Sequence, residues 1–207
     1  MPTDRDVRRF VPWLCPVLIL LGAPSPPLLG QEARLAARLP HGTAVEVQRL
    51  VDSAARLRLP TEPLIQKALE GESKGADSSR IMVAVGGLLA RMDTARQALG
   101  NEASEAELVA GAAALRAGAD PGSVHTLRTL RPNRSLFVPL SVLADLLSDG
   151  VPASQVWSSV RDMASNGASD AQFLRLRDRL GRDGADRPRP LPPAPEHAPG
   201  EASPERP

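Results

Sequence analysis

Apolar residues crowd one stretch near the middle of the chain, residues 135–151 (SLFVPLSVLADLLSDGV). At 3.6 residues per turn its polar side chains share one narrow stripe, made of Ser141, Asp145 and Ser148. A helix that is apolar around most of its circumference must be covered on most sides. Its core of about twelve residues is too short to cross a bilayer, which takes roughly 20. The pattern therefore predicts a central buried helix with Ser135 as its N-cap.

A second helical stripe lies upstream. Its apolar positions recur at spacings of three and four, and they are Ile81, Val85, Leu88, Met92, Ala95 and Leu99. This spacing predicts a helix of about five turns, with Arg80, Arg91 and Arg96 turned largely outward. Gly86-Gly87 lies within the stripe at a cost of about 1 kcal/mol per glycine relative to alanine. A close helix crossing or a local kink would account for the pair.

The starts and ends of further helices are marked by local signals. Thr43 with Glu46, and Ser104 with Glu107, each match a capping box that opens a helix. A short joint also recurs, in which an apolar residue precedes Pro, Asp or Ser and a second apolar residue follows five positions after the first. It occurs as LPTEPL (59–64), ADSSRI (76–81), ADPGSV (119–124), VPASQV (151–156) and ASDAQF (168–173).

These joints predict tight turns between helices. Four of the five follow a glycine, namely Gly75, Gly118, Gly150 and Gly167, and glycine readily takes the left-handed conformation that closes a helix. The two apolar residues of each joint fit a hydrophobic staple at the start of the next helix. No stretch alternates as a strand does. We therefore expect an all-α fold: a compact array of short helices joined by tight Gly/Pro/Asp turns, with degenerate helical-hairpin repeats around the central buried helix.

The two ends of the chain differ from this helical part. Residues 1–30 combine early arginines, a 13-residue apolar run (VPWLCPVLILLGA) and a proline-rich stretch ending in Gly30, which is typical of a secretory signal peptide. Residues 182–207 contain eight prolines and almost no large apolar residue, so a disordered tail is expected. The sequence thus predicts a signal peptide (1–30), an all-helical domain (31–181) and a Pro-rich disordered tail (182–207). The mature protein is expected in the periplasm or outside the cell, with no stable membrane span.

Charge and composition narrow the classes of partner. The formal net charge is +1, which gives no overall attraction to nucleic acid or to an anionic membrane. The single cysteine, Cys15, lies in the signal segment, so no internal disulfide is expected. The joints, the Ala- and Arg-rich helices and the signal segment resemble those of uncharacterised exported all-helical proteins of GC-rich bacteria. This resemblance covers about residues 31–181, and it implies no activity and no site residues.

No pattern of catalytic or metal-binding residues stands out. The three histidines lack the spacing of helical metal ligands, and the G-x-S-x-G of a serine nucleophile is absent. Asp145 and Asp149 could bring two carboxylates together near i,i+4 spacing, although a solvated helix end explains them better. GESKG (71–75) lacks the strand and the Lys-Ser/Thr ending of a phosphate loop, so a helix end is expected there. We expect no cofactor and no enzymatic activity, with a hydrolase as a distant third alternative.

The main candidate site is basic. The segment between Asp120 and Asp145 has no acidic residue, and its basic side chains recur every three residues, at His125, Arg128, Arg131 and Arg134. We call these four residues the basic stripe. The guanidinium group of arginine can bond two oxygens of a phosphate or carboxylate group, so the stripe could bind an anion or an acidic partner. The alternative is a solvated face in which Arg134 hydrogen-bonds to nearby helix carbonyls.

Two function classes follow from these patterns. The first is a non-enzymatic exported helical module that binds an unidentified protein or cell-envelope component. The alternative is a binder of a small anionic or phosphorylated ligand through the basic stripe.

Overall fold

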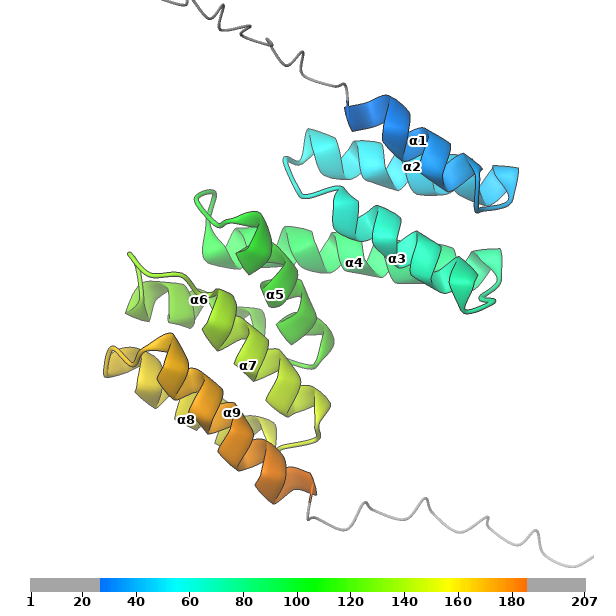
Figure 1. Cartoon of the computed structure of the whole chain (residues 1–207). Helices are drawn as coiled ribbons and strands as arrows, with labels where there is room; N and C mark the ends of the chain where they lie inside the picture. The colour runs from blue at the N-terminus through cyan, green and yellow to red at the C-terminus, as the bar shows by residue number, and fades with distance from the viewer. Residues whose placement is uncertain (1–26, 186–207) are drawn as a thin grey trace, which may run out of the picture.

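The computed structural model describes residues 27–185, and all secondary structure in this part is helical, as Figure 1 shows. Its helices are α1 (Pro27–Ala36), α2 (His41–Arg56), α3 (Glu62–Ser73), α4 (Ser78–Leu99), α5 (Glu105–Arg116), α6 (Pro121–Leu130), α7 (Phe137–Ser148), α8 (Ala153–Ser165) and α9 (Asp170–Ala185). The predicted all-α fold is confirmed.

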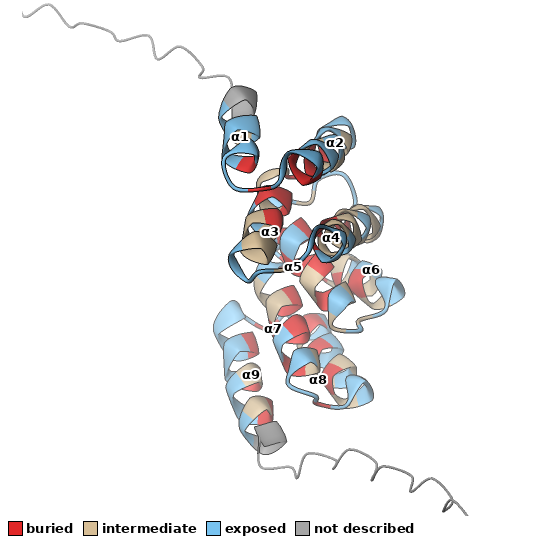
Figure 2. Ribbon diagram, turned by 90° about the vertical axis from the view of Figure 1, so that its right-hand side faces the viewer, coloured by how far each residue is buried: buried red, intermediate tan, exposed pale blue. Residues whose placement is uncertain are grey.

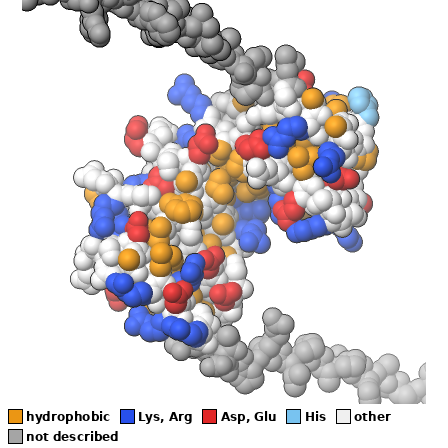
Figure 3. Space-filling view, viewed as in Figure 1, with side chains coloured by type: hydrophobic (Ala, Val, Ile, Leu, Met, Phe, Trp, Pro, Cys, Tyr) orange, Lys and Arg blue, Asp and Glu red, His pale blue; other side chains and the backbone are white. Residues whose placement is uncertain are grey.

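The helices pack in two layers. In one layer α5, α7 and α9 lie side by side, and in the other α2, α4, α6 and α8 follow one another. Both α3 and α5 pack on the long helix α4 but scarcely touch each other. The space-filling view is hollowed at this place (Figure 3). We call this feature the central hollow.

The apolar positions that join the layers come from every helix and form one continuous core. Figure 2 shows the buried residues on the inward sides of the helices, with exposed residues outside. The core is mostly aliphatic, and Phe173 is its largest fully buried side chain. Because small side chains such as Ala95 and Ala110 lie between the helices, the helix backbones can approach closely.

Helix α7 is the central helix predicted from residues 135–151. It packs against α5, α8 and α9, and its buried residues are Pro139, Leu140, Val142, Leu143, Ala144 and Leu146. Ser135 is not its N-cap, contrary to our prediction. The N-cap is Leu136, which is fully buried and whose N–H donates to the Glu107 carboxylate at 2.8 Å. The core and this carboxylate thus hold Leu136 outside the first helical turn.

The turns follow the glycine signals. All four glycines of the joints have positive φ, and so does Gly100 after α4. The capping box of Ser104 and Glu107 is present at the start of α5. The box predicted at Thr43 is wrong, because α2 begins two residues earlier, after Pro40. Thr43 is buried inside the helix, with its hydroxyl 2.6 Å from that of Ser78.

The repeat within the array stays a prediction. The helices range from 10 residues in α1 and α6 to 22 in α4, so successive helix pairs are unequal in length. Between residues 27 and 185 no helix combines the length and the apolar character that crossing a membrane requires.

The helical part extends slightly beyond the predicted boundaries at both ends. Helix α1 begins at Pro27 and therefore contains the predicted cleavage position after Gly30. Helix α9 continues through Ala185, so the first four residues of the predicted tail, 182–185, are helical. The rest of the predicted signal peptide and of the Pro-rich tail lies outside the described residues.

Candidate functional site

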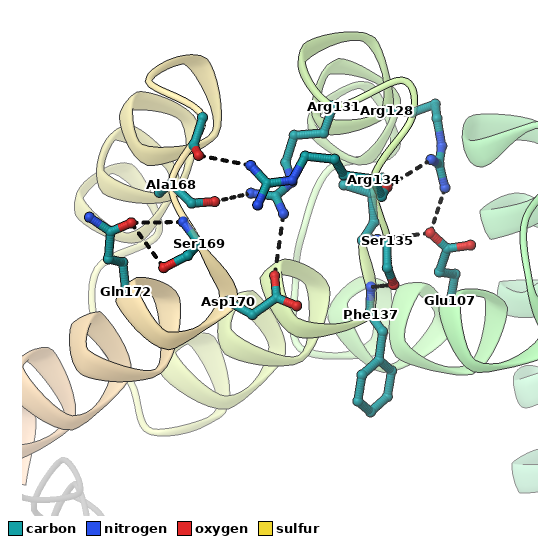
Figure 4. A network of polar contacts seen from close by, with 12 residues as sticks. Glu107, Arg128, Arg131, Arg134, Ser135, Phe137, Ala168, Ser169, Asp170 and Gln172 are labelled. Carbon is teal, nitrogen blue, oxygen red and sulfur yellow. Dashed lines mark hydrogen bonds and ion pairs between the residues drawn. The ribbon is translucent and has the colours of Figure 1, made fainter.

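The basic stripe lies at the end of α6 and in the connection to α7. Its three arginines come together, as Figure 4 shows. Arg128 is on α6, Arg131 directly follows that helix, and Arg134 is in the connection. His125 is separate from them, with its Nδ1 atom 3.1 Å from the carbonyl oxygen of Ala98. The predicted helical stripe therefore ends at Leu130, and the chain turns before Arg134.

Arg131 is buried, with 2% of its surface exposed. Its guanidinium donates to the carbonyl oxygen of Ala168 at 2.6 Å and to the carboxylate of Asp170 at 3.3 Å. It also lies 5.1 Å from the centre of the Phe173 ring, within the range of a cation–π contact. Burial lowers the pKa of Arg131, and the charge of Arg134 lowers it further. Arg134 donates to the Gly167 carbonyl at 2.8 Å, so both side chains bond the turn between α8 and α9.

Arg128 points the other way, toward α5. Its guanidinium donates to the carboxylate of Glu107 at 2.6 Å and to the carbonyl oxygen of Arg134 at 3.3 Å. Glu107 is only 5% exposed and also accepts bonds from the N–H groups of Ser104 and Leu136, both at 2.8 Å. Burial raises the pKa of Glu107, but these hydrogen bonds outweigh burial and leave the pKa below its usual value of 4.5.

These contacts form one polar network that we call the Glu107 clamp: Glu107, Arg128, Arg131, Arg134 and Asp170. It joins the N-terminal end of α5 to that of α9 through the connection that precedes α7. The geometry favours a structural role for the basic stripe, in which arginines donate to carbonyls at helix ends. We expected this role for Arg134 alone, and the structure also gives it to Arg131. Sequence reasoning found Glu107 only as a capping residue, because its ion pair joins positions 21 residues apart.

A different surface is exposed beside the clamp. Six large apolar side chains of the described residues are exposed: Val45, Leu57, Val83, Val109, Phe137 and Leu174. The last three lie one on each of three neighbouring helices of the same layer, Val109 on α5, Phe137 on α7 and Leu174 on α9. Their exposed fractions are 36%, 46% and 40%. We call these residues the apolar face. Hydrophobic side chains gather over this layer and extend toward the central hollow (Figure 3).

Two further arginines lie where α4 and α5 meet. Near the turn between these helices Gly111 packs so closely that a Cβ atom there would lie 3.0 Å from that of Ala95. One turn farther along each helix come Arg91 and Arg116. The positive charge of Arg116 lowers the pKa of Arg91, after the larger effect of burial. Arg91 is half-buried and does not point fully outward as its position in the sequence suggests.

The Gly86-Gly87 pair belongs to this same region and shows neither the kink nor the close helix crossing that we considered. Helix α4 is uninterrupted here, and a Cβ atom on Gly86 would meet nothing within 4 Å. A Cβ atom on Gly87 would lie 3.2 and 3.3 Å from the two terminal nitrogens of Arg91. The close helix crossing is at Gly111, whereas Gly87 has only the end of the flexible Arg91 side chain near it.

The carboxylates considered for catalysis lie in a shallow cleft between α7 and α9. Asp145 is 3.6 Å from Arg177, and Asp149 is the C-cap of α7. Both side chains are exposed, as expected for a solvated helix end. Within residues 27–185 no group of three or more His, Cys, Asp or Glu side chains has an arrangement that could hold a metal ion.

Comparison with known proteins does not place the chain in a family. No protein-family model, no curated protein and no solved structure matches it.

Proposed function

We propose that this chain is a non-enzymatic, exported helical module that binds a polypeptide partner along the apolar face. The observation that carries the proposal is the exposure of Val109, Phe137 and Leu174 on three consecutive helices of one layer. Aromatic side chains such as Phe137 are enriched in protein interfaces. Figure 3 shows hydrophobic side chains gathered over this layer, and exposed apolar patches mark interaction sites.

The clamp supports this proposal by fixing the helices that carry the face. Its bonds hold the ends of α5 and α9 against the residues that precede α7. A surface that is already ordered before binding loses less conformational entropy when its partner docks. The same bonds occupy the guanidinium groups of Arg128, Arg131 and Arg134, so a polypeptide on the apolar face is better supported than a small anion on the basic stripe.

Paired substitutions test the proposal. The double change Phe137→Ser and Leu174→Ser removes two exposed anchors, while Val83→Ser on α4 removes an apolar side chain that is 74% exposed in the other layer. Each exposed change should alter the unfolding free energy by no more than about 0.5 kcal/mol. We expect a polypeptide to co-purify with the tagged wild-type protein and with Val83→Ser, and to be lost in the double variant. Retention by the folded double variant, or equal loss in Val83→Ser, would contradict the proposal.

A further inference from the structure

The apolar face continues into the cleft between α7 and α9. Ser148, which lines this cleft, lies about three helical turns from Phe137 on the same side of α7. Gly181 also lines the cleft, about two turns from Leu174 on the same side of α9. The two helices pack against each other. The exposed surface is therefore one strip, with Phe137 and Leu174 at one end and the cleft at the other. We call it the α7–α9 strip.

The cleft end of the strip is acidic. The cleft has a volume of about 560 Å³, and its charged side chains are Asp145, Asp149, Asp178, Arg177 and Arg182. Arg177 lies 3.6 Å from Asp145 and 3.2 Å from Asp178, whereas Asp149 makes no ion pair with any described residue. Three carboxylates thus face two guanidinium groups, and a further cation would be attracted to the place beside Asp149.

The chain itself contains a segment with complementary chemistry. Helix α9 ends at Ala185, one turn beyond Gly181, and 22 residues follow it. They begin with DRPRPLPPAP (186–195), which combines Arg187 and Arg189 with five prolines and one leucine. Proline-rich segments adopt an extended polyproline II helix before they bind, and such helices dock on surfaces with exposed aromatic side chains. The segment therefore offers cations for the cleft and an apolar ridge for the other end of the strip.

The length of this segment also matches the strip. Ala185 lies eight residues beyond the α9 residue that pairs with Asp145, which is about 12 Å along the helix. Four residues of a polyproline II helix span about the same distance, so a chain that turns back at Ala185 brings Arg189 level with Asp145. Phe137 lies about 12 Å farther along α7. Four more residues of the segment cover that distance and place Pro193 level with Phe137.

We infer that residues 187–195 of the same chain bind along the α7–α9 strip as a polyproline II ligand. The two arginines of the segment pair with the cleft carboxylates, and residues 191–193 cover Phe137 and Leu174. Because the segment is tied to α9, its effective concentration at the strip is far higher than that of a separate molecule at low concentration. It therefore competes with the polypeptide partner for two of the three anchors of the apolar face, a consequence that rests on the proposed function.

A nitroxide spin label on the segment tests the inference in the full chain. Cys15→Ser removes the single native thiol, so Ala194→Cys then carries the only label, and Ser203→Cys carries it nine residues farther on as the control. We expect the label at 194 to broaden the backbone amide resonances of Phe137 and Leu174 far more than that of Val83 in the other layer. Equal broadening at these three amides, or the same pattern from the label at 203, would overturn the inference.

A matched pair of charge reversals checks the ion pairs without changing the described helices. Arg189→Glu places a negative charge against Asp145 and Asp149, whereas Arg206→Glu makes the same change outside the segment. Arg189→Glu should weaken the docking about fivefold, as the loss of an exposed ion pair implies, and the broadening at Phe137 should fall with it. Arg206→Glu should leave the broadening unchanged. Equal broadening in both variants would overturn the inference.

The two proposals fail separately. If the label at 194 does not reach Phe137 while the partner still depends on Phe137 and Leu174, the intramolecular ligand is wrong and the apolar face stands. If the label reaches Phe137 while the partner does not depend on those residues, the polypeptide function is wrong and the strip binds only the chain's own segment. Broadening that passes from labelled to unlabelled copies would assign the segment to a second copy and overturn the inference.

Discussion

Replacing Glu107 by glutamine tests whether the clamp holds the fold together. The carboxylate uses one oxygen for Ser104 and the other for Arg128 and Leu136. A glutamine keeps the shape but presents an NH₂ group in place of one oxygen. That group faces either the partly buried N–H of Ser104 or the buried N–H of Leu136, so at least one of these donors loses its acceptor.

The cost follows from the burial of these groups. An unsatisfied buried donor costs about 1–3 kcal/mol, and breaking a buried ion pair costs about 3–5 kcal/mol. Glu107 is buried, but the Arg128 side chain is 22% exposed, so water can still solvate part of the guanidinium. We therefore expect Glu107→Gln to lower the unfolding free energy by about 2–4 kcal/mol.

Urea denaturation followed by far-ultraviolet circular dichroism measures this change. Glu102→Gln is the matched control, since it makes the same chemical change at an exposed position in the turn before α5, where the effect should stay within about 0.5 kcal/mol. If both variants unfold at the same urea concentration with the same slope, the clamp does not stabilise the fold. The arginines of the basic stripe would then again be candidates for binding.

Three further stability predictions follow from the packing and the charges. Leu143→Asp places a charge at a core position that is 2% exposed, and should lower the unfolding free energy by more than about 4 kcal/mol. Asp145→Asn removes only an exposed ion pair and should lower it by less than about 1 kcal/mol. Thermal melts compare the two variants. The pKa of Glu107 is lowered in the folded state. The stabilisation by its carboxylate is therefore complete above the usual pKa of 4.5 and is lost as the pH falls through the folded-state pKa. Urea titrations below pH 4.5 should show that the unfolding free energy falls more steeply with pH in the wild type than in Glu107→Gln. Gly111→Val would overpack the crossing with Ala95 and should cost about 1–3 kcal/mol, seen as a lower urea midpoint.

Much of the fold was predictable because its causes are local. The stripe from Ile81 to Leu99 is a property of neighbouring turns of one helix, and it correctly predicts α4. The glycines before the joints and the capping box at Ser104 are likewise local, and the structure has both. The box at Thr43 failed because Pro40 provides a competing helix start.

The role of the basic residues was not predictable because its causes are distant in the sequence. Arg131 meets the carbonyl of Ala168 and the carboxylate of Asp170, 37 and 39 residues farther on. Nothing near Arg131 in the chain distinguishes it from a solvated arginine. Arg91 is the opposite case: its helical position suggests an outward side chain, but packing of α5 on α4 shields part of it.

Site-specific photo-crosslinking tests the central claim, that the apolar face binds a polypeptide, most directly. A photoreactive amino acid is placed in turn at Val109, Phe137 and Leu174 in the native cell, and at Val83 as the control. The account predicts that all three positions of the face yield the same adduct and that the Val83 position does not. Different adducts from the three positions, or the same adduct from Val83, would contradict it.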